Sequence, residues 1–334
     1  MGATLLAVIL TAVLSASASN ISEQCQVHNE RRITCSCIGN EELFLPENYN
    51  YTRITNVSVT GCIRANFHYN SLWKASNIEE IIIQNIEDYL DFDVSIESNN
   101  MKLLKLSNIG RIPLIASHTF TNLKTIDTFT IENALIENFE EDFNFVNVSH
   151  FILTNVVIKH INKLNFSEKS TTLRIVNSKF RNVTSFLNFA NFRNVDIIDS
   201  MLELYTPGVV SIQGDTTVVR NSSFSNVSMS LVAAESITIS GICADGKSTL
   251  RVLSKSINST NNRMPNEITY RNDNQPKVLI KKNNIVCKAG NCDCPKSSGQ
   301  AQSRTIVLTL IVGCLLTASL SRSFFYLFYD YNIL

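Results

Sequence analysis

A five-residue pattern recurs at nearly constant spacing in the middle of the chain: FILTN at 151–155, LRIVN at 173–177, VDIID at 195–199, TVVRN at 217–221 and ITISG at 237–241. In most copies the first and third residues are apolar and the fifth is Asn. Successive copies begin 22, 22, 22 and 20 residues apart. The same register continues upstream through FTIEN at 129–133, LKLSN at 104–108, IIIQN at 81–85 and VSVTG at 57–61, which gives nine units.

This period predicts a solenoid, because a short strand repeated every twenty or so residues buries its apolar face only by stacking on its neighbours. Further apolar pairs follow the Asn at fixed distances, as Ile158 and Ile161 follow Asn155. They indicate that the chain leaves the strand at a turn and then runs along the edge of the core that the coils share. We expect Asn155 and Asn177 to be buried ladder residues that bond backbone groups left unpaired where strand pairing stops.

The unit at 104–123 carries a family resemblance, with its strand, an Ile-Pro step at 112–113 and a returning Phe120 and Leu123. Over roughly residues 40–245 the chain resembles an extracellular leucine-rich repeat protein. The resemblance implies an α/β solenoid, a horseshoe with a parallel sheet of about nine coils. In that family the Asn is expected three residues after the second strand apolar, whereas here it follows by two. A right-handed parallel β-helix, which also stacks coils of this length, therefore remains the alternative.

The N-terminal residues 1–18 have the features of a secretory signal peptide. The apolar run at 5–14 is too short to span a bilayer, and Ala-Ser-Ala at 16–18 is a small-x-small cleavage pattern. The rest of the chain divides by composition into an N-terminal Cys cap at 19–56, the repeat solenoid at 57–245, a C-terminal Cys cap with loops at 246–296, a stalk at 297–304 and an apolar tail at 305–334.

Eight of the nine Cys form two sets of four, one at each end of the repeats. These are Cys25, Cys35, Cys37 and Cys62, then Cys243, Cys287, Cys292 and Cys294. A solenoid exposes apolar surface at its ends, so a disulfide-tied cap at each end is expected, with pairing inside each set. A zinc site is disfavoured because no His lies near the Cys-x-Cys at 35–37.

The C-terminal tail predicts attachment to a membrane. Small residues including Ser297 and Ser298 precede a polar spacer and a terminal apolar tail, as in a signal for a glycosylphosphatidylinositol anchor. The lipid would replace the tail at Ser297 or Ser298 and hold the protein on the extracellular face of the plasma membrane. The alternative is a single transmembrane helix, although Arg322 interrupts the apolar run.

Charge and sequons bear on partners and modification. Lys plus Arg number 29, as do Asp plus Glu, and no basic stripe is present, so nucleic-acid binding is not expected. Secretion would expose Asn-x-Ser/Thr sequons to glycosylation. Glycans are expected at Asn50, Asn56, Asn147, Asn165, Asn182, Asn226 and Asn258. The sequon at Asn221 is expected to stay empty, because a ladder position implies burial.

Catalytic motifs are missing from the sequence. The five His have no metal-ligand spacing, and neither a phosphate-binding loop nor a nucleophile elbow occurs, so no metal, cofactor or enzymatic activity is expected. The acidic residues Asp88, Asp91 and Asp93 lack the turn Gly of a calcium loop and are interpreted as a solvated edge. Arg174 and Asp196, one coil apart, are interpreted as a surface ion pair.

The strand residues that point away from the core would form two stacked columns. At their centre an apolar patch rimmed by charge is the predicted partner-binding surface: Ile152, Thr154, Arg174, Val176, Asp196 and Ile198. We therefore expect a cell-surface recognition or adhesion protein that presents its repeats to a protein ligand or co-receptor without enzymatic activity. The alternative is a secreted carbohydrate-active β-helix enzyme, which would need clustered carboxylates on one face of adjacent coils. The oligomeric state is left open.

Overall fold

The structure, a computed structural model, describes residues 19–20, 22–37, 41–47, 49–140, 143–166, 168–264, 269–271 and 285–286. The chain separates into two compact units, Met1–Cys292 and Asp293–Leu334, and all described residues belong to the first. The predicted signal peptide, the anchor residues Ser297 and Ser298, the apolar tail, and Cys287, Cys292 and Cys294 lie outside the described residues.

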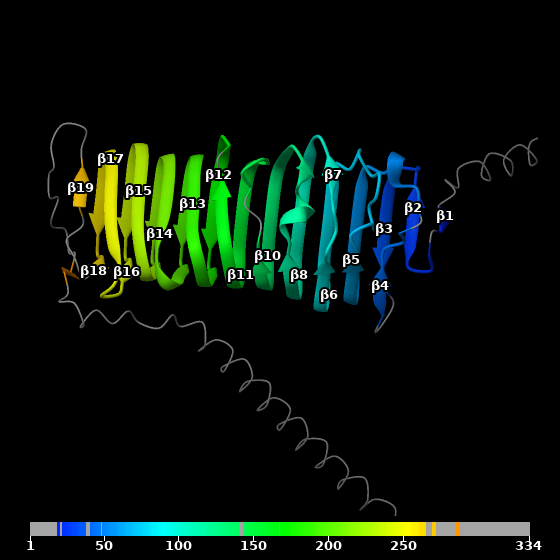
Figure 1. The fold of residues 1–334 in the computed structure, drawn as a ribbon, viewed down its shortest axis with the longest axis horizontal. Coiled ribbons are helices and arrows are strands. Elements are labelled where there is room, and N and C mark those ends of the chain that lie inside the picture. Colours follow the sequence, from blue (N-terminus) through cyan, green and yellow to red (C-terminus); the bar gives the residue numbers. More distant parts are fainter. Residues whose placement is uncertain are drawn as a thin grey trace, which may run out of the picture. The chain divides into compact units, whose positions relative to one another are not determined.

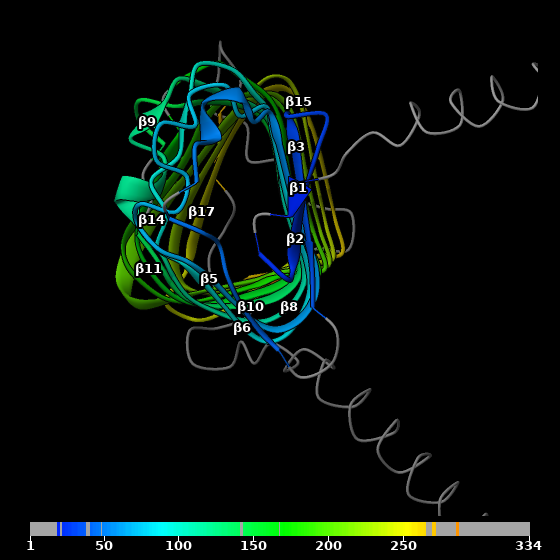
Figure 2. The same ribbon diagram turned by 90° about the vertical axis from the view of Figure 1, so that its right-hand side faces the viewer.

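The described chain forms a parallel β-solenoid, in which long strands stack in register along one axis (Figure 1). The body of the stack consists of β5 (Asn56–Phe67), β6 (Glu80–Phe92), β8 (Met101–Ile115), β10 (Thr125–Phe139), β11 (Asn147–Phe166), β12 (Ser170–Val176), β13 (Lys179–Ile198), β14 (Met201–Arg220), β15 (Ser223–Ser240) and β17 (Thr249–Thr260). Each strand pairs in parallel with the equivalent strand of the next coil. Viewed along the axis, successive coils superimpose around one interior (Figure 2).

Shorter elements complete the two ends and one side of the stack. At the N-terminal end lie β1 (Ser19–Asn20), β2 (Cys25–His28), β3 (Arg32–Ser36) and β4 (Glu42–Phe44). At the C-terminal end lie β16 (Cys243–Ala244), β18 (Arg263–Met264), β19 (Thr269–Arg271) and β20 (Ile285–Val286), whereas β7 (Glu97–Ser98) and β9 (Asn122–Leu123) form a separate two-stranded sheet. The stack therefore extends through β17, into residues that composition assigned to the C-terminal cap.

The solenoid prediction is confirmed, but the α/β horseshoe does not fit. A horseshoe returns each unit through helical or irregular segments outside its sheet. The described residues contain only two 3-10 turns, η1 (Tyr51–Arg53) and η2 (Ser117–Thr119), and strands such as β13 run for 20 residues. The unit that suggested the family is the one with η2 and the short β9 on its return path. The other N-terminal coils also return through turns or short strands, at 68–79 and 93–100, whereas from β11 onward the return segments are themselves strands.

A left-handed residue marks the same corner of every coil and explains the repeated Asn. Ten stacked positions have φ between 47° and 72°: Gly61, Asn85, Asn108, Asn133, Asn155, Asn177, Asp199, Asn221, Gly241 and Asn261. Most L-residues avoid this region, whereas Gly enters it freely and Asn and Asp tolerate it. The backbone conformation at the corner therefore selects the fifth residue of each copy.

The prediction that Asn155 and Asn177 are buried is wrong, because both side chains lie outside the coil and are exposed. They do form a ladder: Nδ2 of Asn177 donates to Oδ1 of Asn155 over 3.2 Å, and Nδ2 of Asn155 donates to Oδ1 of Asn133 over 2.8 Å. The ladder faces solvent because the left-handed residue turns the chain at the corner. The side chain of the corner residue therefore points outward, and the side chain of the next residue points inward.

A buried Ser ladder performs the function that was expected of Asn. Ser178, Ser200 and Ser222 directly follow corner residues and are 1%, 3% and 1% exposed. Their hydroxyls accept hydrogen bonds from the backbone N–H groups of Val156, Ser178 and Ser200, over 3.1, 3.2 and 3.1 Å. Each hydroxyl thus satisfies a buried donor of the preceding coil, where ladder pairing is interrupted.

Stacked aromatic rings fill the middle of the core. The ring centroids of Phe143 and Phe166 are 4.9 Å apart and those of Phe166 and Phe189 are 5.9 Å apart, both pairs in stacked geometry. The ring centroid of Phe166 also lies 5.0 Å from that of Phe151, which belongs to the same long strand, β11. Identical residue types in register therefore continue the core from coil to coil, as a solenoid requires.

The N-terminal cap is a hairpin closed by disulfides. Strands β2 and β3 pair antiparallel, Cys25 bonds to Cys35, and Cys37 bonds to Cys62 in the first full coil. Pairing within the N-terminal set is therefore confirmed. Cys243 is also disulfide-bonded, and its partner does not belong to the N-terminal set, whose four members bond to one another. Within the described residues, no helix has the length and apolar character needed to cross a bilayer.

Candidate functional site

The stacking places the predicted partner-binding residues on one face. Arg174 lies opposite Ile152 on one side and Asp196 on the other, and Val176 lies between Thr154 and Ile198 in the same way. The alternate residues Leu153, Ile175 and Ile197 are fully buried, so the six predicted side chains point outward. With the next coil, this surface is called the sheet-face patch: Ile152, Thr154, Arg174, Val176, Asp196, Ile198, Val218 and Arg220.

The expected ion pair between Arg174 and Asp196 is not formed. Their side-chain charges are farther apart than 4.0 Å, although the two residues are in register on adjacent strands. A pair does form earlier in the same columns, where Nζ of Lys105 lies 3.1 Å from Oε2 of Glu132. The patch thus carries two cations, Arg174 and Arg220, and one anion, Asp196, and none of the three is in an ion pair with a described residue.

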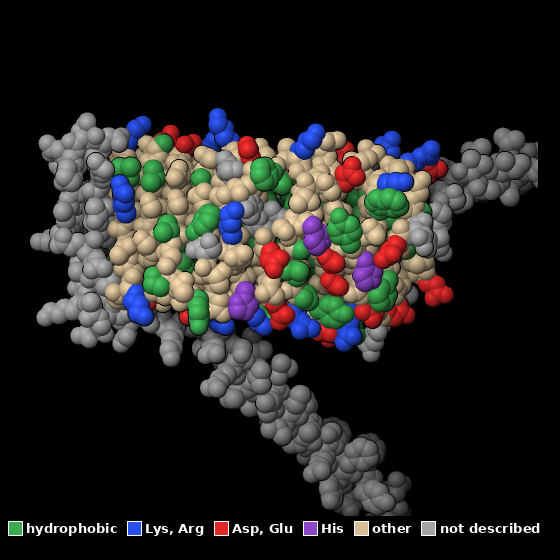
Figure 3. Space-filling view, in the orientation of Figure 1, with side chains coloured by type: hydrophobic (Ala, Val, Ile, Leu, Met, Phe, Trp, Pro, Cys, Tyr) green, Lys and Arg blue, Asp and Glu red, His purple; other side chains and the backbone are tan. Residues whose placement is uncertain are grey.

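A second surface, which sequence reasoning missed, gathers exposed aromatic side chains near the N-terminal end. Phe44, Tyr69 and Trp73 are 52%, 51% and 63% exposed. The Phe44 ring lies 5.9 Å from the ring of His68, and the Tyr69 ring lies 5.3 Å from that of His118. In Figure 3, His and acidic side chains lie among hydrophobic ones over the N-terminal strands.

Two carboxylates complete this surface. Nε2 of His118 lies 2.8 Å from Oδ1 of Asp93, at ion-pairing distance but without hydrogen-bond geometry. Burial raises the pKa of the Asp91 carboxyl above its ordinary value, the charge of Asp93 raises it further, and His68 opposes the shift. We call this surface the aromatic–acidic cluster: Phe44, His68, Tyr69, Trp73, Asp91, Asp93 and His118.

The expectation of a simple solvated acidic edge therefore needs correction. Asp91 is half-buried, Asp93 faces His118, and Oδ2 of Asp88 accepts from Nε of Arg64 over 2.9 Å. The guanidinium of Arg64 also lies 5.3 Å from the ring of Tyr89, beside the cluster. No group of three potential ligands among the described residues is placed to hold a metal ion.

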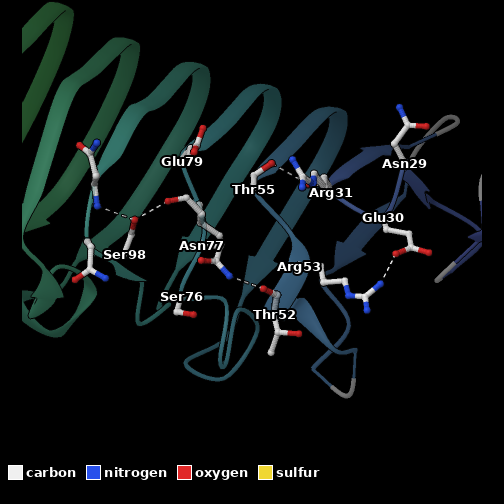
Figure 4. A pocket seen from close by; sticks show the side chains of 13 residues that line it. Asn29, Glu30, Arg31, Thr52, Arg53, Thr55, Ser76, Asn77, Glu79 and Ser98 are labelled. Carbon is white, nitrogen blue, oxygen red and sulfur yellow. Dashed lines mark hydrogen bonds and ion pairs between the residues drawn. The ribbon is translucent and has the colours of Figure 1, made fainter.

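The groove in Figure 4 crosses four N-terminal coils at one corner and has a volume of about 620 Å³. Its polar groups bond mainly to one another. Nδ2 of Asn77 donates to the Thr52 carbonyl over 2.7 Å, and Oγ of Ser98 donates to the Ile78 carbonyl over 2.6 Å. Nη1 of Arg53 lies 2.5 Å from Oε2 of Glu30, as Figure 4 shows. These contacts tie successive coils together at this corner.

The sequons differ in how far their Asn side chains are available. Asn50 and Asn258 are exposed, whereas Asn56, Asn147, Asn165, Asn182 and Asn226 are half-buried. Asn221 is exposed, so the reason for expecting it to stay empty is wrong. The Nδ2 group of Asn226 donates to the carbonyls of Leu204 and Tyr205, over 3.1 and 3.3 Å, which uses both of its hydrogens.

Comparison of the chain with protein-family models, with curated proteins and with solved structures finds no match.

Proposed function

We propose that this chain is a non-enzymatic cell-surface recognition protein that binds a protein ligand through the aromatic–acidic cluster. The supporting observation is the exposure of Phe44, Tyr69 and Trp73 within the first coils of a rigid stack. Trp and Tyr dominate the binding energy of protein interfaces, because each buries a large area with few rotatable bonds. Phe44 lies on β4, which pairs in parallel with β5, and the Tyr69 ring lies against that of His118, so these two rings are held before binding, which lowers its entropic cost.

The charges of the cluster define the ligand further. Asp91 and Asp93 lie among the aromatic rings, and His118 neutralises Asp93 only when its ring is protonated. A ligand surface with an apolar centre and a Lys or Arg at its edge would complement this arrangement. Arg is the better match, since its guanidinium can stack on an aromatic ring while it bonds a carboxylate.

The cellular setting belongs to the same proposal. Disulfides in the cap are compatible with an oxidising compartment. A signal peptide at 1–18 and a lipid anchor at Ser297 or Ser298 would place the solenoid on the outer face of the plasma membrane. Ligand binding would then reach the cell interior only through a spanning co-receptor.

A test would display the full chain on cells and measure binding of a panel of purified extracellular proteins. Trp73→Ala and Tyr69→Ala should each weaken a binder by about 10-fold or more, as loss of an interface anchor does. Phe145→Ala is the matched control, because Phe145 is 91% exposed and lies outside the cluster. Binding that survives both cluster substitutions but not the control would contradict the proposal.

A carbohydrate-active enzyme is the second candidate, and the paired Asp91 and Asp93 are the observation that favours it. Glycoside hydrolysis uses one carboxylic acid of raised pKa and one carboxylate, and the pKa of Asp91 is raised. Release of reducing ends from a polysaccharide panel, abolished by Asp91→Asn and by Asp93→Asn, would identify this activity. If no polysaccharide of the panel is cleaved while the chain still binds its protein ligand, the result would support the recognition function.

A further inference from the structure

We propose that the sheet-face patch binds a second copy of this chain, face to face and with the two stacks antiparallel. The proposed dimer concerns the middle coils, whereas the proposed ligand concerns the N-terminal cluster. The two proposals are therefore independent.

The first reason is the apolar character of the outward face. Ile152, Val176, Ile198 and Val218 lie on four adjacent coils and point away from the core. Parallel sheets are normally covered on both faces, and their strands then read as nearly continuous apolar runs. The patch has this character in part, because FIL at 151–153 is a continuous apolar run, whereas Arg174 and Asp196 interrupt the two central strands. A face of this kind gains stability when another apolar surface covers it.

The second reason is the order of side chains along the first column, which reads Ile152, Arg174, Asp196, Val218. This order is self-complementary. A two-fold axis in the plane of the face, parallel to the strands and between the coils of Arg174 and Asp196, sets Arg174 opposite the partner's Asp196. The same axis sets Ile152 opposite the partner's Val218, so charge meets opposite charge and apolar meets apolar.

The second column follows the same rule. Val176 and Ile198 occupy the two central coils, and the axis places Val176 opposite the partner's Ile198. Thr154 then faces the partner's Arg220 at the exposed rim, where the guanidinium meets a hydroxyl and no like charge. A two-fold contact requires self-complementarity of one patch, and both columns satisfy it.

The third reason is that the central charges have no partner within the chain. Arg174 and Asp196 form neither an ion pair nor a hydrogen bond with any described residue, unlike Lys105 and Glu132 in the same columns. Pairing across the two-fold axis therefore breaks no internal contact. Each dimer would contain two such pairs, and opposite charges in register fix the relative position of two surfaces.

The size of the patch implies a weak dimer. Four coils about 4.8 Å apart and a strand segment of about five residues give roughly 300 Å² of flat area per copy. Stable complexes bury about 800 Å² per partner. Two copies attached to one membrane would meet at a far higher effective concentration than in solution, so a weak contact suffices there.

The test is sedimentation velocity of the purified full chain over a concentration series up to about 0.5 mM, a range suited to weak contacts. We expect reversible dimers. Arg174→Asp and Asp196→Arg should each raise the dimer Kd by about 10-fold or more, because both create facing like charges. The double variant Arg174→Asp/Asp196→Arg should return the Kd to within about 3-fold of the original, because it restores both pairs in reverse. Arg251→Asp, the same charge change at an exposed position of β17, is the control and should leave the Kd unchanged.

Thermal melting of each variant checks that the fold is intact, and recovery in the double variant separates a lost contact from misfolding. A chain that stays monomeric throughout the series would overturn the proposal. So would dimers that ignore both single substitutions, or a double variant that remains as weak as the single ones. A different protein bound to this face of a monomeric chain would equally overturn it.

Discussion

At the residue scale, two consecutive residues with different roles form the corner of each coil. The corner residue supplies a left-handed backbone, and the next residue supplies a buried hydrogen-bonding group. Asn177 and Ser178, then Asp199 and Ser200, show this division in consecutive coils. The Asn of the repeat pattern therefore indicates a left-handed backbone at the corner. The Ser that follows it indicates a buried position that needs a hydrogen-bond acceptor.

This division predicts different outcomes for two substitutions in one corner. Asn177→Leu should lower the free energy of unfolding by about 1–2 kcal/mol, because a Leu side chain is strained at the left-handed φ of 48°. Asn177→Gly should cost only a few tenths of a kcal/mol, since Gly adopts this conformation freely. Urea denaturation of both variants measures the difference, and equal losses would mean that the exposed amide ladder matters more than the backbone.

The neighbouring Ser gives a second prediction. Ser200→Ala should lower the free energy of unfolding by about 1–3 kcal/mol, because the buried N–H of Ser178 loses its acceptor. Ser236→Ala, at a half-buried position of β15, is the matched control and should have little effect. Urea denaturation would again provide the values. A loss at Ser236 as large as that at Ser200 would contradict a special role for the Ser ladder.

Glycan occupancy is the third residue-scale prediction, and it reverses part of the expectation from sequence. Asn221 is exposed at a corner, so it should carry a glycan, whereas Asn226 should not, since both hydrogens of its Nδ2 bond to carbonyls. A glycan replaces one of those hydrogens and must also clear the coil surface. Mass spectrometry of glycopeptides from protein made in a secretory host decides between the sites, and occupancy of Asn226 alone would contradict the assignment.

At the element scale, Asp245 joins β15 to the turn before β17. Its carboxylate accepts from Oγ of Ser248 over 2.6 Å, from Oγ of Ser225 over 2.7 Å and from the backbone N–H of Asn226 over 3.2 Å. Burial by itself would raise the pKa of Asp245, but these hydrogen bonds outweigh burial and hold it below its ordinary value. The charged form is thus the one that the fold prefers.

This lowered pKa predicts that the C-terminal coils weaken in acid. A carboxyl whose folded pKa is depressed contributes stability above its unfolded pKa of about 3.9 and loses it as pH falls through the folded pKa. Asp245→Asn should remove that part of the pH dependence and expose the amides of β17 to faster hydrogen exchange at neutral pH. Exchange rates in β17 that do not differ between the variant and the original chain would contradict this role.

Among the elements, the short strands of the repeat were predictable from the sequence, but the segments that connect them were not. The alternation of apolar and polar residues within 151–155 and its repeats predicted parallel, in-register strands and their outward face. This succeeded because the two-residue period of a strand can be read from a few neighbouring residues. The return segments were not predicted. In β11 the inward residues fall at Val156, Ile158, Ile161 and Leu164, since each bend adds a residue and breaks the alternation of a strand. That irregular spacing fits the return path of a horseshoe equally well.

The aromatic–acidic cluster was missed for a related reason. Its members come from four successive coils and mostly from segments beside the repeat, such as the turn that holds Tyr69 and Trp73. No spacing in the sequence connects them. Their proximity depends on coils of 22 to 25 residues stacking in register, so that Phe44, His68 and Asp93 come to one face. Only the exposed Trp73, the one Trp of the chain, offered a sequence signal.

At the scale of the whole molecule, stability of a solenoid is close to a sum over coils and their interfaces, so its ends are where unfolding begins. The N-terminal end is protected by a hairpin that Cys25 and Cys35 close and by a link from Cys37 to Cys62 into the first full coil. Only the second bridge joins the cap to the stack. Losing it should therefore release the cap as a unit.

The Cys37→Ser/Cys62→Ser variant should lower the free energy of unfolding by about 3 kcal/mol, because the bridge closes a segment with a sequence separation of 25. The Cys25→Ser/Cys35→Ser variant should lose slightly less, since its separation is 10. Hydrogen exchange gives the sharper contrast. Removal of the bridge from Cys37 to Cys62 should accelerate exchange across β3 and β5 while β13 and β14 keep their protection, as expected for fraying from one end. Uniform acceleration along all coils would show instead that the stack unfolds as one cooperative block, and the description of stability as a sum over neighbouring coils would then fail for this protein.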